Sequence, residues 1–229
     1  MALKILVITP VFYPELATSG RESADLASEL TLYGHSVTVI TSFPSRPGGK
    51  IFPGFRRRLW SKERVDAGYD LVRVFSFFSS ESTLLSRFWE NLSFGLFSSL
   101  AIMLSHPLDV VYANTWPLLA GAMTALAARV RRVPLVLTIQ DVYPESLAAQ
   151  DRLVEGQRPY QWMLKLDRWL ARQAAKVVVI SERFRKIYLE DRRLPAEKLE
   201  LVYNWMDPEL LTPVVGENPL RKRLGINPE

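Results

Sequence analysis

The stretch Leu135-Val-Leu-Thr-Ile-Gln-Asp141 is a short apolar run that stops at a polar loop, Val142-Tyr-Pro-Glu-Ser146. An earlier stretch repeats this order, because Leu3-Lys-Ile-Leu-Val-Ile-Thr9 leads into the loop Phe12-Tyr-Pro-Glu-Leu-Ala-Thr-Ser-Gly20. Such runs are typical of buried parallel strands, which present functional groups at their carboxyl ends. We therefore expect the two loops to meet at one edge of a sheet and to shape a cleft for a phosphorylated, hydroxyl-rich substrate.

Further apolar runs predict more strands, and helical patterns lie between them. This alternation is typical of right-handed βαβ units and of a mostly parallel sheet covered on both faces. The predicted fold class is therefore α/β, with a doubly wound, mostly parallel Rossmann-like sheet. The predicted strands span residues 3–9, 36–41, 69–76, 109–112, 134–139, 176–180 and 199–203, and the predicted helices span 20–33, 82–105, 118–131, 158–174 and 182–190.

Composition limits the class of protein. With 48% hydrophobic and 23% charged residues, a chain of 229 residues can bury a sizeable core. It has no cysteine, which excludes disulfides, thiolate metal sites and cysteine nucleophiles. The first residues do not have the pattern of a secretory leader, and we expect a cytoplasmic protein. Prolines and glycines follow residue 207, so we expect one domain over 1–207 and, over 208–229, an interdomain linker with the truncated start of a second domain.

Basic residues gather in three clusters, within a formal net charge of +5. Such clusters attract polyanions, and anionic phospholipids or nucleoside diphosphates fit as well as nucleic acid does. Because no nucleic-acid recognition motif accompanies them, we expect no nucleic-acid partner. For each cluster alone, a solvated surface is the favoured interpretation. The clusters are Arg56 to Arg58 with Lys62 and Arg64; Arg183, Arg185, Lys186, Arg192 and Arg193; and Arg221 to Arg223.

The segment 91–105 carries no formal charge and is rich in leucine and phenylalanine. It is shorter than the roughly 20 apolar residues that a membrane-spanning helix needs. We interpret it as a buried crossover helix, with an interfacial face for a membrane or a partner as the alternative.

The loop before the first predicted helix is a candidate phosphate site. Thr18, Ser19 and Gly20 offer hydroxyls and close backbone approach at a helix amino end, where backbone amides bind anions. We expect Ser19 or Gly20 to cap this helix, and Glu22 and Asp25 to favour its positive amino end. The helix should end at Gly34, and His35, which begins the second predicted strand, is expected to be a boundary residue that bonds the turn rather than a catalytic one. By itself, a serine and a glycine at a helix start are a weak signal, and they form neither a dinucleotide fingerprint nor a P-loop.

The loop after residue 139 carries the candidate catalytic group. Asp141 and Glu145 lie on either side of Pro144, where a carboxylate could bind or deprotonate a sugar hydroxyl. Paired carboxylates also occur in glycoside hydrolases, but loop spacing does not establish the separation that this chemistry needs. The competing interpretation is that Asp141 or Glu145 caps the next helix.

Other candidate residues follow neighbouring strands. Asn114 and Trp116 end the fourth predicted strand, and Trp116 could stack on a sugar or a base, or pack in the core. Ser181 is expected to cap a helix. The loop from Pro44 to Gly54 is too rich in proline and glycine for regular structure, and it either borders the cleft or only connects elements. No metal-ligand spacing and no nucleophile elbow is present, so we expect no metal and no serine hydrolase.

These residues together resemble the amino-terminal domain of GT-B retaining glycosyltransferases of family 4, particularly the bacterial cell-surface polysaccharide type. The resemblance covers nearly the whole chain, and the order and spacing of its motifs are more specific than any one of them. The matching stretches are Tyr13 to Gly20, Leu32 to Thr41, Pro44 to Gly54, Asp109 to Ala113, Gln140 to Ser146, Val177 to Ser181, and Lys198 to Asn204 with Asp207.

The resemblance implies two facing Rossmann-type domains with a nucleotide sugar between them. It implies that Gly20 approaches the donor diphosphate, and that Gln140 and Asp141 face the reaction centre. Many relatives carry histidine near Gln140, and an amide cannot accept a proton, so the basic role falls to Asp141 or to the donor phosphate. The remaining residues expected to line the acceptor or the reaction centre are Tyr143, Glu145, Asn114, Trp116 and Pro44.

The function implied is sugar transfer from a nucleoside-diphosphate sugar to a glycan or polyprenyl-lipid acceptor, without metal or cofactor. The second domain, which carries the family's Glu-x7-Glu signature, is missing, so the isolated chain is expected to be inactive. Peripheral contact with the anionic inner face of the cell membrane is a further expectation. The alternative is a non-enzymatic module that senses a nucleotide or phosphate. An epimerase or dehydrogenase is disfavoured, because the glycine fingerprint and a Tyr-x-x-x-Lys pair are both missing.

Overall fold

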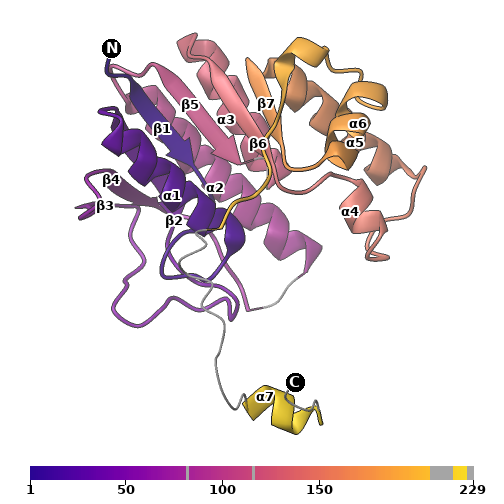
Figure 1. Ribbon diagram of the computed structural model, residues 1–229, viewed down its shortest axis with the longest axis horizontal. Coiled ribbons are helices and arrows are strands. Elements are labelled where there is room, and N and C mark those ends of the chain that lie inside the picture. Colours follow the sequence, from indigo (N-terminus) through magenta and orange to yellow (C-terminus); the bar gives the residue numbers. More distant parts are fainter. Residues whose placement is uncertain (81–82, 115–116, 207–218, 226–229) are drawn as a thin grey trace.

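The apolar runs of the sequence form one sheet at the centre of the molecule (Figure 1). The structure is a computed structural model that describes residues 1–80, 83–114, 117–206 and 219–225. Its strands are β1 (Lys4–Ile8), β2 (Ser36–Ser42), β3 (Trp60–Arg64), β4 (Asp70–Val74), β5 (Val110–Asn114), β6 (Leu135–Ile139), β7 (Lys176–Val179) and β8 (Leu199–Leu201). They lie in the order β3-β4-β2-β1-β5-β6-β7-β8.

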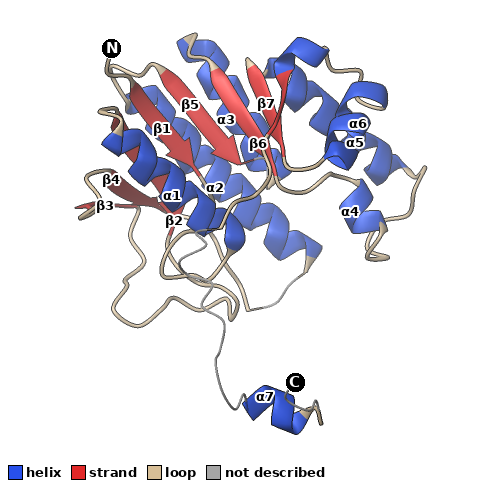
Figure 2. Cartoon of the chain, in the orientation of Figure 1, coloured by secondary structure: helices blue, strands red, loops and turns tan. Residues whose placement is uncertain are grey.

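Helices connect most of these strands, as Figure 2 shows. They are α1 (Thr18–Leu32), α2 (Leu84–Leu104), α3 (Leu118–Arg131), α4 (Glu145–Ala148), α5 (Arg158–Gln173), α6 (Glu182–Glu190) and α7 (Pro219–Arg223), with the 3-10 turn η1 (Ala196–Lys198). Every neighbouring pair of strands is parallel except β3 and β4. The predicted α/β, doubly wound, mostly parallel Rossmann-like fold is therefore confirmed.

Strand β3 was not predicted from the sequence. It pairs antiparallel with β4 at the edge of the sheet, with Lys62 opposite Val72, and its side chains are largely exposed. An edge strand that buries neither face lacks an apolar pattern, so only its backbone pairing defines it. The short helix α4 was also missed, because four residues are too few to show a helical period.

Alternate residues of the central strands enter two separate cores. On β1, Leu6 and Ile8 pack in a cluster with α2, α3 and α5, whereas Ile5 and Val7 pack in a second cluster with Ala24 and Ala27 of α1. This is the period of two expected for a strand that is buried on both faces. The two cores fix the register of β1 and hence the level at which the following loop leaves the sheet.

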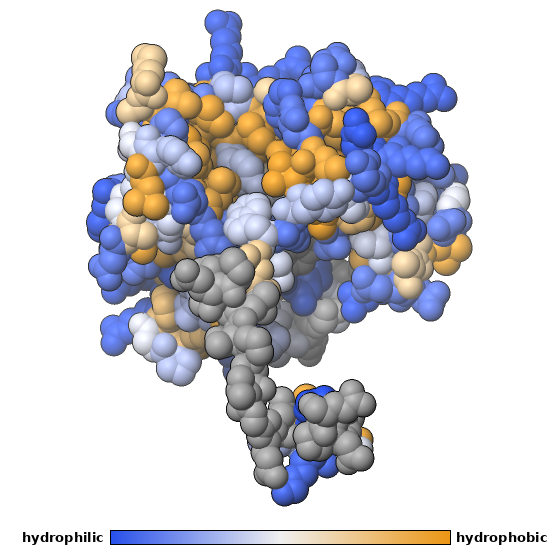
Figure 3. Space-filling view, in the orientation of Figure 1, coloured by the Kyte–Doolittle hydropathy of each residue, from blue (hydrophilic) through white to orange (hydrophobic). Residues whose placement is uncertain are grey.

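Helices cover the two faces of the sheet unequally, although the sequence predicted a sheet that is covered on both faces. On the α1 side, the side chains of β5 to β7 are half-buried, and Figure 3 shows hydrophobic residues gathered over these strands. The half-buried side chains are Val110, Tyr112, Val136 and Val178. The reason is the position of α1 on this face. Its Ala24 and Ala27 pack on β1, β2 and β4, and so leave β5 to β7 less covered.

Helix α2 has one buried and one exposed face, so a buried crossover helix describes only part of the segment 91–105. A side chain on Gly95 would lie 2.9 Å from the Cα of Ala120, so glycine allows α2 and α3 to touch. The opposite face exposes large apolar side chains. These are Leu85, Phe88, Trp89, Leu96, Leu100, Met103 and Leu104. Within the described residues, no helix has the length and apolar character required to cross a bilayer.

The predicted domain boundary after residue 207 lies outside the described residues, and it stays a prediction. Helix α7, which belongs to the stretch predicted as a linker and second-domain start, is five residues long and mostly basic.

Candidate functional site

The first loop and the loop after β6 meet at the carboxyl edge of the sheet. The Gln140 amide donates from Nε2 to Oε2 of Glu22 at 2.7 Å, across 118 residues of sequence. Glu22 lies on α1 two residues after Gly20, and Gln140 precedes Asp141. The loop that leads into α1 and the loop after β6, called the acidic loop below, therefore meet at one edge of the sheet, called the rim below. This is expected for the carboxyl ends of parallel strands.

Helix α1 begins at Thr18, earlier than predicted. Ala17 is its N-cap in an extended conformation, and its carbonyl accepts from the amides of Gly20 and Arg21 at 3.1 Å. The prediction that Ser19 or Gly20 caps the helix is wrong, because both lie inside the first turn. No acidic residue occupies that turn, so Glu22 and Asp25 do not sit at the positive end as predicted.

The residues of the predicted diphosphate loop differ in exposure. Thr18 is exposed, Ser19 is half-buried and Gly20 is buried. A Cβ on Gly20 would lie 3.0 Å from the carbonyl oxygen of Val11, so any side chain would push α1 away from the first loop. The amides of Thr18 and Ser19, unlike those of Gly20 and Arg21, donate to no described residue, and such amides are the general basis of anion binding at a helix start.

Glu22 is a buried carboxylate that the sequence did not single out for the site. Its residue is 5% exposed, and its Oε1 is buried without a hydrogen-bond partner among the described residues. Burial raises the pKa of Glu22 above its ordinary value, although the charge of Arg21 opposes the shift. In the sequence, Glu22 is only an acidic residue near a helix start. Its partner Gln140 is 118 residues away, so no local pattern indicates that the two side chains meet.

A segment after β8 closes over the same rim. Asn204 donates from Nδ2 to Oε1 of Gln140 at 3.1 Å, so both ends of that amide are engaged. Trp205 donates from its indole to Asp25 at 3.3 Å, and its carbonyl accepts from Arg21 at 3.1 Å. Together these bonds fix the orientation of Gln140 between α1 and the chain after β8.

Asp141 is the free carboxylate of the rim. It is exposed and makes no hydrogen bond or ion pair with any described residue. Partial burial of its carboxyl raises the pKa above the ordinary value for aspartate. An unpaired carboxylate with a raised pKa is able to orient a hydroxyl group or accept its proton.

The rest of the acidic loop is anchored in the protein. Tyr143 and Pro144 are buried, and burial, followed by the charge of Asp141, raises the pKa of Tyr143. Glu145 begins α4, and its two carboxylate oxygens each accept from Arg192 at 2.6 Å. Neither Asp141 nor Glu145 caps α4, because Pro144 is its N-cap and no side-chain cap bond exists. Arg192 is 1% exposed, so the interpretation of its basic cluster as a solvated surface is wrong at this residue.

The proline-rich loop is tied to the first loop. Pro44 is buried, and the amides of Ser45 and Arg46 both donate to Oε1 of Glu15 at 2.7 Å. Glu15 is 4% exposed and was not predicted to have a role. Because of this carboxylate, the loop from Pro44 lies against the chain that leads into α1.

The remaining sequence predictions have mixed outcomes. Asn114 is buried at the end of β5, and Trp116 lies outside the described residues.

Ser181 caps α6 by accepting from the Phe184 amide at 3.2 Å, as predicted. His35 accepts from the Leu3 amide at 3.2 Å, so its side chain bonds the chain before β1 and not the turn as predicted. Across the described part of the chain, no group of three or more His, Cys, Asp or Glu residues could hold a metal ion.

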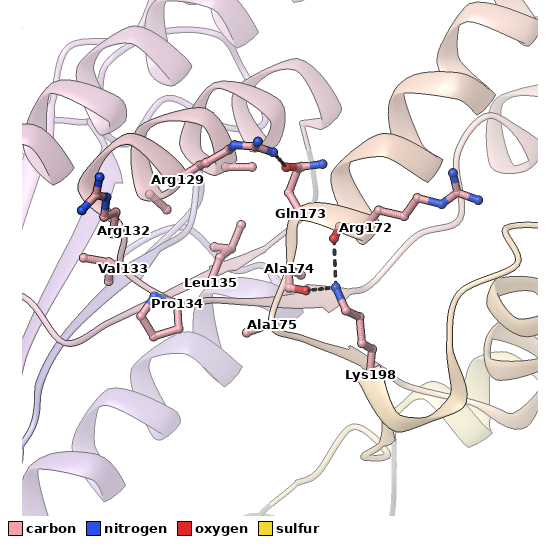
Figure 4. A pocket seen from close by; sticks show the side chains of 12 residues that line it. Arg129, Arg132, Val133, Pro134, Leu135, Arg172, Gln173, Ala174, Ala175 and Lys198 are labelled. Carbon is pink, nitrogen blue, oxygen red and sulfur yellow. Dashed lines mark hydrogen bonds between the residues drawn. The ribbon is translucent and has the colours of Figure 1, made fainter.

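A pocket of about 510 Å³ lies at the opposite, amino ends of β6 to β8 (Figure 4). Four cations line it, but they do not converge: Arg129 turns to Gln173, and the guanidinium of Arg172 points away from the pocket. The ammonium of Lys198 donates to the carbonyls of Arg172 and Ala174, at 2.9 and 2.8 Å, and so caps the end of α5. This pocket is therefore separate from the rim and lacks the geometry of an anion site.

Comparison with known proteins gives a family and a shared fold. A family model described as a glycosyl transferase 4-like domain matches residues 18–205. HepE of Anabaena, solved in complex with UDP, is 18% identical with a TM-score of 0.52, and the match covers 97% of this chain and 50% of HepE. A UDP-glucose: anthocyanidin 3-O-glucosyltransferase in complex with UDP is 15% identical with a TM-score of 0.52, over 96% of this chain and 57% of that one.

The chain thus spans about half the length of HepE. No curated protein matches it. At these identities the solved structures show a shared fold, and this fold is that of the GT-B glycosyltransferases, as the sequence resemblance implied.

Proposed function

Because the chain belongs to the glycosyl transferase 4-like domain family, we propose that it is the acceptor-side domain of a retaining glycosyltransferase that uses a nucleoside-diphosphate sugar. The observation that carries the proposal is the shared rim. There, Gln140 bonds to Glu22 of α1 and the neighbouring Asp141 carboxylate has no partner among the described residues. This arrangement joins an anion-binding helix end to a group suited to orienting a hydroxyl.

The donor diphosphate is proposed to lie against the first turn of α1, with Thr18, Ser19 and the backbone of Gly20 beside it. The missing side chain of Gly20 lets α1 pack on the backbone of Val11 and Phe12, which sets the position of its first turn. The HepE and anthocyanidin glucosyltransferase structures were solved with UDP, which makes a uridine nucleotide the first donor to test.

In the proposed reaction, a hydroxyl oxygen of the acceptor forms a bond to the anomeric carbon, and the bond from that carbon to the diphosphate breaks. The electron pair of the broken bond leaves with the nucleoside diphosphate. Asp141 orients the acceptor hydroxyl and accepts its proton, or the leaving phosphate accepts the proton on the same face of the sugar. Tyr143, Glu145, Asn114, Trp116 and Pro44 are proposed to shape the acceptor side, and no metal takes part.

The test is a transfer assay with the complete protein that carries this domain. A panel of uridine- and guanosine-diphosphate sugars is offered with a polyprenyl-phosphate-linked glycan, and release of nucleoside diphosphate is measured with and without acceptor. We expect acceptor-dependent release with at least one donor, and none from residues 1–229 alone. Tight nucleotide binding without release from any donor would favour the alternative of a ligand-sensing module, whereas transfer by residues 1–229 alone would contradict the half-domain assignment.

The acceptor is proposed to be a glycan on a lipid carrier, reached at the inner face of the cell membrane. Two surfaces support contact with anionic lipid: the exposed residues Arg56 to Arg58, and the exposed apolar face of α2. The basic residues lie close to α2, because the Arg57 guanidinium stacks 4.0 Å from the Phe78 ring and 5.5 Å from Phe75, whose ring lies 5.5 Å from that of Phe97 on α2.

Replacing Arg56, Arg57 and Arg58 by glutamate is expected to weaken binding to phosphatidylglycerol vesicles by at least tenfold in a flotation assay. The reason is that each basic residue near an anionic surface contributes about 1 kcal/mol, an effect that salt reduces. A variant with Arg183 and Arg185 changed to glutamate is the control for loss of charge elsewhere. Unaltered vesicle binding by the triple variant would refute the membrane assignment.

A further inference from the structure

Arg192 lies where three segments meet beneath the acidic loop. Besides Glu145, its guanidinium donates from Nη2 to the carbonyl of Tyr143 at 2.8 Å and from Nε to Oδ2 of Asp167 at 2.7 Å. Asp167 also accepts from the Tyr188 hydroxyl at 2.9 Å. A single buried side chain thus joins the loop after β6 to α5 and α6.

Val142 and Tyr143 pack in the core, whereas the polar restraint on residues 143–145 comes from Arg192. Helix α4 is four residues long and has no side-chain cap, and a helix of that length is unstable by itself. The Asp141 side chain makes no bond with the described residues, so its position depends on the chain on either side of it: Gln140, which Glu22 and Asn204 hold, and the residues that follow. The following chain is held at Tyr143, two residues on, and at Glu145, both by Arg192.

We propose that Arg192 is a positioning residue for Asp141. Its planar guanidinium fixes the course of residues 143–145, and through them it holds the Asp141 carboxylate at the rim. At 1% exposure Arg192 cannot reach a ligand, so any effect on transfer must pass through the loop. The reaction part of this proposal rests on the proposed function, whereas the structural part does not.

The charge balance of the cluster favours this role. Two carboxylates surround one guanidinium, and their hydrogen bonds and charges raise the pKa of Arg192 despite its burial. The cation is therefore permanent. Lysine could keep the charge, but it lacks the fork that binds both oxygens of Glu145 and the Tyr143 carbonyl together.

Hydrogen exchange of residues 1–229 tests the structural part without any assay of transfer. The amides of residues 146–149 bond back to carbonyls of residues 142–145 within the α4 turn. In Arg192→Lys and Glu145→Gln we expect exchange of these amides to be at least tenfold faster, while β6 amides keep their rate. Arg183→Met, an exposed arginine on α6, is the matched control. Unchanged exchange of residues 146–149 in both variants would overturn the proposal.

Kinetics of the complete protein test the effect on Asp141. We expect Arg192→Lys to lower kcat by about 10- to 100-fold with donor KM within threefold, as for a displaced reacting group. Combined with Asp141→Asn, the same change should have almost no further effect. If the kcat losses of the two single variants multiply in the double variant, Arg192 does not act through Asp141. If Asp141→Asn itself leaves transfer intact, the proposed function fails, and the exchange result still decides whether Arg192 holds the loop.

Glu145→Gln guards against a folding defect, because Glu145 is partly exposed and its loss leaves the Arg192–Asp167 pair intact. We expect Glu145→Gln to lower kcat as much as Arg192→Lys does. The variant that carries both changes should lose no more than either alone, because the two residues form one shared restraint. Normal kcat in Glu145→Gln, together with reduced kcat in Arg192→Lys, would contradict a restraint that acts through the loop.

Discussion

Asp141→Asn is expected to lower kcat for sugar transfer by at least a hundredfold in the complete protein, which corresponds to about 2.7 kcal/mol of transition-state stabilisation. The amide keeps the shape of the side chain but can neither accept the proton nor attract the acceptor hydroxyl as strongly. Donor KM should change little, because the diphosphate is proposed to lie at α1. The measurement is steady-state transfer at saturating acceptor.

The pH profile provides a second readout of the same variant. Partial burial raises the pKa of Asp141, so ionisation of this carboxyl is less favourable in the folded protein than in water. A base must be deprotonated, so wild-type kcat should fall as the pH drops through this raised pKa. In Asp141→Asn that acidic limb should disappear from the residual activity. If the limb persists unchanged, the proton acceptor is another group, with the donor phosphate as the named alternative.

Stability distinguishes a chemical loss from a folding loss. Because ionisation of Asp141 is disfavoured by its surroundings, the neutral asparagine should leave the melting temperature unchanged or slightly higher. Glu29→Gln, on the exposed side of α1, is the control for a carboxylate removed elsewhere, and it should keep wild-type kcat. Wild-type kinetics in Asp141→Asn would remove Asp141 from the reaction centre.

The sequence predicted the location of this rim but not its pairing. Apolar runs ending at Thr9 and Ile139 indicated parallel strands, and parallel strands bring their carboxyl ends together. By contrast, the bond from Gln140 to Glu22 spans 118 positions and the contact of Arg192 with Glu145 spans 47, so no local pattern indicates either. Arg192 looked like a surface cation because it precedes Arg193 in a basic cluster, and only tertiary packing buries it.

Local rules also failed where the backbone decides the outcome. Ser19 and Gly20 are favoured caps, yet α1 starts from Ala17, since the carbonyl of that residue receives the first helical amides. Where a cap had no competitor within two residues, as at Ser181, the prediction was correct. Local chemistry therefore predicted most of the elements, although not β3 and α4, and long-range packing determined which polar groups face the rim.

Asp167→Ala is expected to lower the free energy of unfolding by about 3 to 5 kcal/mol, the cost of removing one member of a buried ion pair. Asp167 is 3% exposed and serves both Arg192 and Tyr188, so alanine leaves a guanidinium nitrogen and a hydroxyl without an acceptor. Urea unfolding of residues 1–229 measures the effect. Tyr188→Phe, which removes one of the two bonds, should cost about 1.5 kcal/mol.

Asp191→Ala is the matched control, since it removes an exposed carboxylate next to Arg192 and should change stability by less than about 0.5 kcal/mol. A loss below 1 kcal/mol for Asp167→Ala would mean that the network contributes little to the fold. The double variant Asp167→Leu with Arg192→Met should regain part of the stability, because apolar groups can replace a buried pair. Sugar transfer should not return with it, since no residue then holds Tyr143 and Glu145, and this difference separates stabilisation of the fold from positioning of Asp141.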